Sequence, residues 1–233
     1  MKKFILPFTL FILSCIHSDA QKFSFGPSWK AGISNILLLK TDTIKDHTFN
    51  NRVNFSFQAG AYTQYDFAKH FSAGVELLYW LQNGKLKDQF TYNDGISGKT
   101  VNETDVYKAY LSYVAIPLYF EWAPSDIILL LGGQYGILFS QSGSIKPSTT
   151  VDGVTTEGEK TSRDPNFENY DVGFKAGVLY KLGDNFTAGV EYYNGRVNLS
   201  KNNDDPFSSH NQYFYGAFRY NIVRGKAGQM YYN

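Results

Sequence analysis

The stretch VNFSFQAGAYTQYDFAKHFSAGVELLYWLQ, residues Val53–Gln82, decides the fold. Apolar and polar side chains alternate from Phe55 to Phe67, and the alternation resumes after the polar pair Lys69-His70. A period of two on both sides of a tight turn predicts a β-hairpin. Each arm is longer than a typical soluble strand of about 5–6 residues and reaches the roughly 9–11 residues that a tilted strand needs to cross a bilayer. The hairpin therefore has the length of a membrane-crossing one.

The same hairpin recurs further along the chain. FQAGAY at Phe57–Tyr62 returns as FKAGVL at Phe174–Leu179, and FSAGVELLY at Phe71–Tyr79 returns as FTAGVEYYN at Phe186–Asn194. One hairpin type repeated along a sheet favours a meander that closes on itself. The alternating segments predict eight strands, at Gly26–Leu37, Val53–Phe67, Phe71–Gln82, Val106–Trp122, Ile127–Ser140, Asn169–Leu182, Phe186–Leu199 and Asn211–Val223. We therefore predict an all-β, eight-stranded antiparallel up-and-down transmembrane β-barrel over residues 21–233.

The connections between these strands alternate in length. Long polar segments are expected to be loops at Lys40–Arg52, Asn83–Thr104, Gln141–Glu168 and Ser200–His210, and short turns separate the other strands at Lys69-His70, Ala123–Asp126 and Gly183–Asn185. Outer-membrane barrels have short turns on the periplasmic side and long loops on the outer side. Pro117 cannot donate to a strand ladder, so we expect a β-bulge at that residue. The tail Arg224–Asn233 has no predicted place.

The first twenty residues predict a cleaved signal peptide. Lys2 and Lys3 precede a short apolar run, and Ser18-Asp19-Ala20 supplies the small residues of a cleavage site after Ala20. Cys15 raises a lipoprotein alternative, but bulky Leu13 stands where lipid attachment requires a small residue. After cleavage the chain contains no cysteine, which excludes disulfides and thiol chemistry.

Composition narrows the class of protein further. Removing Lys2, Lys3 and Asp19 from the 22 basic and 21 acidic residues leaves 20 of each, which gives no support for nucleic acid as a partner. The mean hydropathy is −0.31, and no apolar stretch of about 18 residues follows the signal, which argues against transmembrane helices. The 18 Tyr and 19 Phe are too many for a disordered chain. A barrel wall that alternates lipid-facing and interior residues is typical of this mixture.

Glycine and glutamate positions set the inner face of the predicted barrel. The polar residues assigned to the interior are Lys30, Gln58, Glu76, Glu121, Gln134, Lys175, Glu191 and Arg219. An eight-stranded interior is only wide enough for side chains to fill it, and buried charges must pair. Three acids and three bases can balance, so we expect a structural ion-pair network that plugs the barrel, with a conducting or catalytic use as the alternative. Trp29, Trp80 and Trp122 are assigned to aromatic girdles at the membrane interfaces.

The sequence motifs that could support catalysis or metal binding are weak. Glu76 and Glu191 could form an acid/base pair, and His70-Phe71-Ser72 resembles the His-x-Ser arrangement of lipid A deacylase barrels, although it lies at a periplasmic turn. His47, His210 and Asp204-Asp205 lack a second ligand pair at a useful spacing for metal. No phosphate-binding loop or dinucleotide motif is present. We therefore expect no catalytic residues, no cofactor and no metal.

Several motifs resemble one known family. FQAG with YDF at Phe57–Phe67, HFSAGVELLY at His70–Tyr79, YVAIPLYFEW at Tyr113–Trp122, GGQYGILFS at Gly132–Ser140 and FTAGVEYYNG at Phe186–Gly195 are similar to the PorT-like group of outer-membrane protein β-barrels. The resemblance implies an outer-membrane location, and most members have no assigned function. One branch takes part in protein secretion across the outer membrane. Ala115 stands where the family often has an acidic or polar residue, which implies a different interior charge here.

These observations predict a non-enzymatic integral outer-membrane barrel with a structural or interaction role through its outer loops. The alternatives are a narrow channel or subunit of a secretion apparatus, and a barrel hydrolase acting on lipid. Expected partners are outer-membrane lipid and, through the loops or secretion machinery, other proteins. A soluble lipocalin-like barrel would place apolar residues inside and polar ones outside. The directions of Glu76, Lys175 and Glu191 distinguish these orientations.

Overall fold

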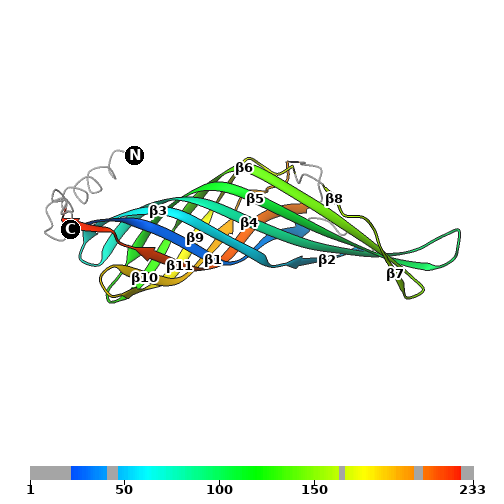
Figure 1. Cartoon of the computed structure of the whole chain (residues 1–233), viewed down its shortest axis with the longest axis horizontal. Coiled ribbons are helices and arrows are strands. Elements are labelled where there is room, and N and C mark those ends of the chain that lie inside the picture. The colour runs from blue at the N-terminus through cyan, green and yellow to red at the C-terminus, as the bar shows by residue number, and fades with distance from the viewer. Residues whose placement is uncertain (1–21, 41–46, 163–165, 202–206, 227–233) are drawn as a thin grey trace, which may run out of the picture.

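Eight long antiparallel strands form a closed ring. A computed structural model describes residues 22–40, 47–162, 166–201 and 207–226. Each strand of the ring pairs with the next along the chain, and β1 pairs with β11 to close it (Figure 1). The ring strands are β1 (Lys22–Lys40), β3 (Asn54–Ala68), β4 (Phe71–Asn93), β5 (Thr100–Trp122), β6 (Ile127–Val151), β9 (Tyr170–Leu182), β10 (Phe186–Gly195) and β11 (Phe207–Tyr220). The predicted eight-stranded up-and-down barrel is confirmed.

Four short strands are added to this ring. β12 (Val223–Lys226) pairs with the start of β1 and includes the first part of the tail Arg224–Asn233, whose remaining residues lie outside the described ranges. β2 (His47–Arg52) pairs with β4, and β7 (Val154–Glu157) and β8 (Thr161–Ser162) pair with β6. The predicted signal peptide, with Cys15, also lies outside the described residues.

Three predicted loops contain β-structure instead. β4 continues to Asn93 and β5 starts at Thr100, so most of Asn83–Thr104 is strand. β6 runs on to Val151, and β2 falls within the predicted loop Lys40–Arg52. We call β2, residues 83–93 of β4, 100–110 of β5, 141–151 of β6, β7 and β8 the projecting sheet; Figure 1 shows it extending well beyond one end of the barrel. Eleven residues of strand reach roughly 35 Å.

The strand ends also differ from prediction near the last long connection. β10 ends at Gly195, four residues before the predicted end at Leu199, and β11 begins at Phe207 rather than Asn211. The bulge expected at Pro117 is wrong. The β4–β5 ladder passes from Val75–Leu118 to Leu78–Ala115 without a change of register, so proline leaves a gap in the pairing and does not shift it. The register shift of the β5–β6 ladder lies at Ser112/Tyr113.

The end of the barrel opposite the projecting sheet carries the short connections. β3 joins β4 at Lys69-His70, and β9 joins β10 at Gly183–Asn185, where Gly183 adopts a φ of 77° that favours glycine. β1 begins and β12 lies at this same end, so long and short connections alternate as predicted. We call it the turn end. The described residues include no helix that is long and apolar enough to cross a membrane.

The two faces of the wall have inverted polarity compared with a soluble protein. Large apolar side chains such as Leu131 and Phe174 point outward and are 67% and 63% exposed. Val190 is also exposed, whereas Gln58 and Glu76 are buried inside. This orientation suits a barrel surrounded by lipid and excludes the lipocalin-like alternative. Trp29 and Trp122 are outward, but Trp80, predicted to lie in a girdle, is fully buried in the interior because it has the same strand parity as Glu76.

Candidate functional site: the closed barrel interior

Each of the eight ring strands contributes one of the predicted interior polar residues. Because side chains alternate along a strand, those sharing the parity of the inward glycines point into the ring. All eight are almost completely buried: Lys30 from β1, Gln58 from β3, Glu76 from β4, Glu121 from β5, Gln134 from β6, Lys175 from β9, Glu191 from β10 and Arg219 from β11. The ring thus brings residues distant in sequence together at one level of the interior.

Six of these residues form what we call the ion-pair network: Lys30, Glu76, Glu121, Lys175, Glu191 and Arg219. Two ammonium groups lie between two carboxylates. Lys30 Nζ contacts Glu76 Oε2 and lies 2.8 Å from Glu191 Oε2. Lys175 Nζ lies 3.2 Å from Glu76 Oε2 and 2.8 Å from Glu191 Oε2. Glu76 and Glu191 therefore each form ion pairs with both lysines. Neither carboxylate is free to act as the acid or the base of a catalytic pair.

Arg219 joins the third acid to this group. Its Nε lies 3.1 Å from Glu76 Oε1, its Nη1 lies 2.5 Å from Glu121 Oε1 and its Nη2 lies 3.3 Å from Glu191 Oε1. The guanidinium also stacks over the Tyr119 ring, 4.5 Å from its centroid. Arginine suits this position because its planar fork can donate in several directions at once. The network is neutral as a whole, with three cations and three anions.

The two interior glutamines contact each other and a buried tyrosine. Gln58 Nε2 lies 3.5 Å from Gln134 Oε1, and that oxygen also accepts a hydrogen bond of 2.9 Å from the Tyr213 hydroxyl. The hydroxyl of Tyr213 thus satisfies a buried amide at the boundary between charged and aromatic side chains. Charged and aromatic side chains form one continuous filling at this level.

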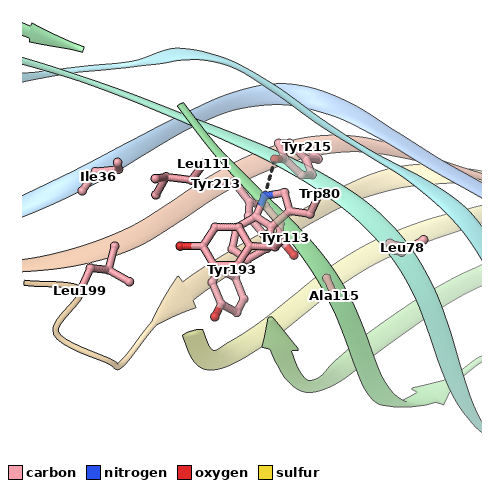
Figure 2. Close-up of a cluster of buried hydrophobic side chains, with 10 residues drawn as sticks. All are labelled: Ile36, Leu78, Trp80, Leu111, Tyr113, Ala115, Tyr193, Leu199, Tyr213 and Tyr215. Carbon is pink, nitrogen blue, oxygen red and sulfur yellow. Dashed lines mark hydrogen bonds between the residues drawn. The ribbon is translucent and has the colours of Figure 1, made fainter. Parts of the chain in front are cut away.

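Five aromatic rings fill the interior toward the projecting sheet, and we call them the aromatic layer: Trp80, Tyr113, Tyr193, Tyr213 and Tyr215 (Figure 2). Trp80 stacks on Tyr113 with ring centroids 4.5 Å apart, and Tyr213 stacks on Tyr193 at 4.9 Å and on Tyr215 at 4.1 Å. The Trp80 Nε1–H donates to the Tyr215 hydroxyl at 3.2 Å, the dashed line in Figure 2. This layer was not predicted, although Trp80 has the parity of inward-pointing Glu76 in the hairpin Val53–Gln82.

Inward glycines make room for these rings. A Cβ at Gly173 would stand 2.6 Å from Cζ of Tyr193, and one at Gly136 would stand 3.1 Å from the Trp80 ring. The glycines that set the inner face in the sequence therefore have a packing role. They bring large aromatic side chains close to the opposite backbone.

Asp171 lies at the outer side of the aromatic layer. Its Oδ2 accepts hydrogen bonds of 3.0 Å from the Tyr193 hydroxyl and 2.9 Å from Asn211 Nδ2, and the same amide nitrogen lies 3.1 Å from the Tyr113 hydroxyl. Among the described residues, no Lys, Arg or His forms an ion pair with Asp171. Neutral donors therefore hold this carboxylate.

A pocket of about 70 Å³ opens at the turn end. Its lining includes Lys69, His70 and Lys181 from the turns, and it reaches inward to Glu121 and Arg219. The ion-pair network forms its floor. The pocket is thus the mouth of a barrel that is filled above it.

The candidate chemical motifs are not assembled. His70 Nδ1 lies 3.1 Å from the Ala123 carbonyl oxygen, whereas Ser72 Oγ contacts Glu121 and Gln64. His47 pairs with Phe90 in the β2–β4 ladder and His210 pairs with Leu37 in the β1–β11 ladder, while Asp204-Asp205 lie outside the described residues. Within the described ranges no group of three His, Cys, Asp or Glu residues is placed to hold a metal ion.

The chain matches one family model and is similar to several solved structures. The family model described as outer membrane protein beta-barrel domain matches residues 20–201. Among solved structures, the attachment invasion locus protein Ail of Yersinia pestis aligns with a TM-score of 0.35 and 12% identity, covering 84% of this chain and 99% of that chain. Neisserial surface protein A gives 0.31 and 10%, covering 86% and 99%. OprG of Pseudomonas aeruginosa gives 0.31 and 9%, covering 87% and 95%. No curated protein matches the chain.

The family match covers more than half of the sequence, and it coincides with a closed ring whose apolar side chains face outward. In barrels of this class the short turns are periplasmic and the long connections face outward. The chain belongs to the outer membrane protein β-barrel domain family and is an integral protein of the bacterial outer membrane.

Proposed function

We propose that this protein is a closed, non-enzymatic outer-membrane barrel that anchors the projecting sheet as an extracellular interaction surface. The observation that carries the proposal is the contrast between a filled interior and strands that continue far beyond it. The ion-pair network and the aromatic layer occupy successive levels of the same ring. β4, β5 and β6 nevertheless run on together beyond the barrel.

A filled interior argues against conduction. A polar channel needs an open path lined by groups that ions can bind and leave. Here Lys30, Lys175 and Glu191 are fully buried and bonded to one another, and the Trp80 ring closes the next level. Reconstitution of the purified protein in planar bilayers is expected to give no discrete current steps. Reproducible single-channel steps that disappear when the protein is omitted would contradict a closed barrel.

The contacts of Ser72 argue against lipid hydrolysis. Ser72 is occupied by Glu121 and Gln64 at the periplasmic mouth, with no histidine bonded to it. Mass spectra of lipid A are therefore expected to be identical with and without the gene. A change in acylation that a Ser72→Ala variant fails to restore would establish a hydrolase instead.

A role as a subunit of a secretion apparatus is the second candidate function. The projecting sheet favours it only in one respect, because a sheet with strand edges can accept a partner strand. Cross-linking from the projecting sheet in intact cells distinguishes the two candidates: capture of secretion components supports the second, and capture of surface material alone supports the first.

Processing of the N-terminus belongs to the same proposal. Export to the outer membrane requires a signal, and residues 1–20 have the composition of one. The intact mass of the purified barrel is expected to correspond to a chain beginning at Gln21. A mass that retains residues 1–20, or carries lipid on Cys15, would contradict this cleavage.

A further inference from the structure

The two faces of the projecting sheet carry opposite charge. Directly paired residues in neighbouring strands point to the same face. Two adjacent rows on one face bring together five cations, which we call the basic face: Arg52, Lys85, Lys87, Lys108 and Lys146. The opposite face carries the acids Asp88, Glu103 and Asp105. Mixed surfaces are usual for soluble sheets, so this segregation needs a cause.

The register makes the basic face compact. Arg52 pairs with Lys85, and Lys85 pairs with Lys108, so three cations stand side by side in one row. The next row on this face contains Lys87, opposite Val106, which in turn pairs with Lys146. Neighbouring strands are about 4.8 Å apart and alternate residues roughly 6.6 Å apart, so the group extends over roughly 16 Å, from Arg52 on β2 to Lys146 on β6.

Few of these charges are neutralised. Within the described residues only Lys146 has an ion pair on this face, at 2.5 Å from Glu157 Oε2. Like charges directly opposite each other destabilise a strand pair, as Lys85 and Lys108 are. All five side chains are partly or fully exposed. An anionic ligand would relieve the repulsion that the protein itself leaves in place.

The basic face continues the lipid-facing surface of the barrel. On β4 the outward parity of Leu77 and Tyr79 is also that of Lys85 and Lys87, and on β5 exposed Tyr110 is followed on the same face by Lys108. Lys85 lies six residues beyond Tyr79, roughly 20 Å along a tilted strand. Lysine stems are long enough to reach back toward the headgroup level. The cations therefore lie beyond the outer edge of the exposed apolar side chains and face the same way as these side chains.

We propose that the basic face binds the phosphate groups of outer-leaflet lipid at the base of the projecting sheet, where its strands leave the barrel. The inference rests on the proposed function only for the placement of this sheet outside the cell. The acidic face would then point away from the bilayer. Cations next to an anionic lipid surface each add a similar increment of attraction, which salt screens.

The test uses the full-length protein purified in a zwitterionic detergent and a lipid A probe with two phosphates. Binding is measured by native mass spectrometry for the wild type and for the variant K85Q/K87Q/K108Q. A matched control, K69Q/K160Q/K201Q, removes the same charge from exposed lysines outside the basic face. Removing each cation of the basic face is expected to weaken binding about fivefold, so the triple variant should lose roughly a hundredfold. The control should lose little.

Further probes identify the ligand chemistry. Lipid A from which both phosphates have been removed should bind the wild type no better than the triple variant binds the intact lipid. Inorganic phosphate should compete only weakly. Equal binding by the triple variant and the control, or equal binding of phosphorylated and dephosphorylated lipid, would overturn the proposal. Tighter binding of a sulfated polysaccharide than of lipid A would also overturn it, in favour of a soluble polyanion.

A failure of lipid binding by the basic face can be distinguished from a failure of the proposed function. The triple variant should still fractionate with the outer membrane and show heat-modifiable gel mobility, because its substitutions lie outside the ring. Loss of lipid binding in that variant then concerns the basic face alone. A wild-type protein that is absent from the outer-membrane fraction would instead defeat the closed-barrel proposal.

Discussion

Three strands, β4 to β6, run through both the wall of the barrel and the projecting sheet, and their side chains are arranged differently in the two regions. Inside the ring, β4 to β6 alternate between lipid-facing apolar side chains and a buried interior. Beyond it, the same strands have most side chains partly exposed on both faces and are rich in Thr, Lys and Asn. Backbone hydrogen bonding is continuous across the boundary.

This contrast shows that the formation of a strand and the alternation of apolar and polar side chains along it have different causes. Ladder pairing and β-propensity suffice to extend a hairpin that is already nucleated. A period of two appears only where one face is removed from water. The ion pairs follow the same division: those of the ring are buried and each cation contacts several acids, whereas the Lys146–Glu157 pair of the sheet is exposed and joins only two residues.

Removing Glu76 should have the largest effect. Glu76 contacts Lys30, Lys175 and Arg219, so Glu76→Gln leaves an excess of buried positive charge. Removing one partner of a buried ion pair costs about 3–5 kcal/mol, and three partners place this variant toward the upper value. Urea unfolding of the barrel in lipid vesicles, followed by tryptophan fluorescence, measures the loss.

A matched exposed pair provides the control. Lys99 and Asp152 lie 2.5 Å apart near the tip of the projecting sheet, with side chains 51% and 61% exposed. Lys99→Gln should change the free energy of unfolding by less than about 1 kcal/mol because solvent screens the pair. Similar losses in the two variants would show that the interior charges are hydrated and that the barrel is open.

Removing the central ring of the aromatic layer should have the next largest effect. Trp80 contacts Tyr113, Tyr193 and Tyr213, and no rearrangement of the wall can fill the space it leaves. Trp80→Ala should therefore cost about 3 kcal/mol in the same unfolding experiment. Trp122→Ala, on the lipid-facing side, is the comparison and should cost less, because lipid fills the gap. Equal losses would place the two tryptophans in equivalent environments.

The interior could be predicted from sequence only in part. Polar residues at inward parity identified Lys30 and Glu76, because a charge among apolar residues is conspicuous. Trp80 was assigned to a girdle since tryptophan is common at membrane interfaces, and that preference was given more weight than its parity. The pairing of a given cation with a given acid depends on the shear of the barrel, that is, on the register between neighbouring strands. The sequence of a single strand does not encode this register.

The projecting sheet could not be predicted by the same method. Segments such as residues 83–93 and 100–105 lack alternation because water reaches both faces, so polar content was taken as a sign of loop. Pro147 lies within β6 between the residues that pair with β8 and those that pair with β7, where its missing N–H interrupts neither of these ladders. Pairing partners were the missing information, and they become visible only when the barrel fixes the neighbouring strands.

Shortening the projecting sheet should leave the barrel almost unchanged. Leu86 and Tyr107 are directly paired, so replacing residues 87–106 by Asn-Gly would join them through a two-residue hairpin turn. The ion-pair network and the aromatic layer lie below the cut. The variant should retain heat-modifiable mobility and a similar unfolding midpoint. A barrel that no longer folds would show that the sheet is needed to nucleate the ring.

The smallest effect is expected at the tip between β4 and β5. The Ser97 hydroxyl donates to Asp94 Oδ2 at 2.6 Å, and this bond, together with that from the Ile96 N–H, lowers the pKa of Asp94 below its ordinary value. A lowered carboxyl pKa means that the turn is stabilised above the ordinary pKa and loses that stabilisation as pH falls through the lowered one. Ser97→Ala should raise the pKa of Asp94, which NMR titration of the Asp94 carboxyl carbon measures. The barrel signals should not move over the same pH range, because the tip lies at the far end of the projecting sheet from the ring (Figure 1). An unchanged Asp94 titration in Ser97→Ala would mean that the hydroxyl does not hold the turn.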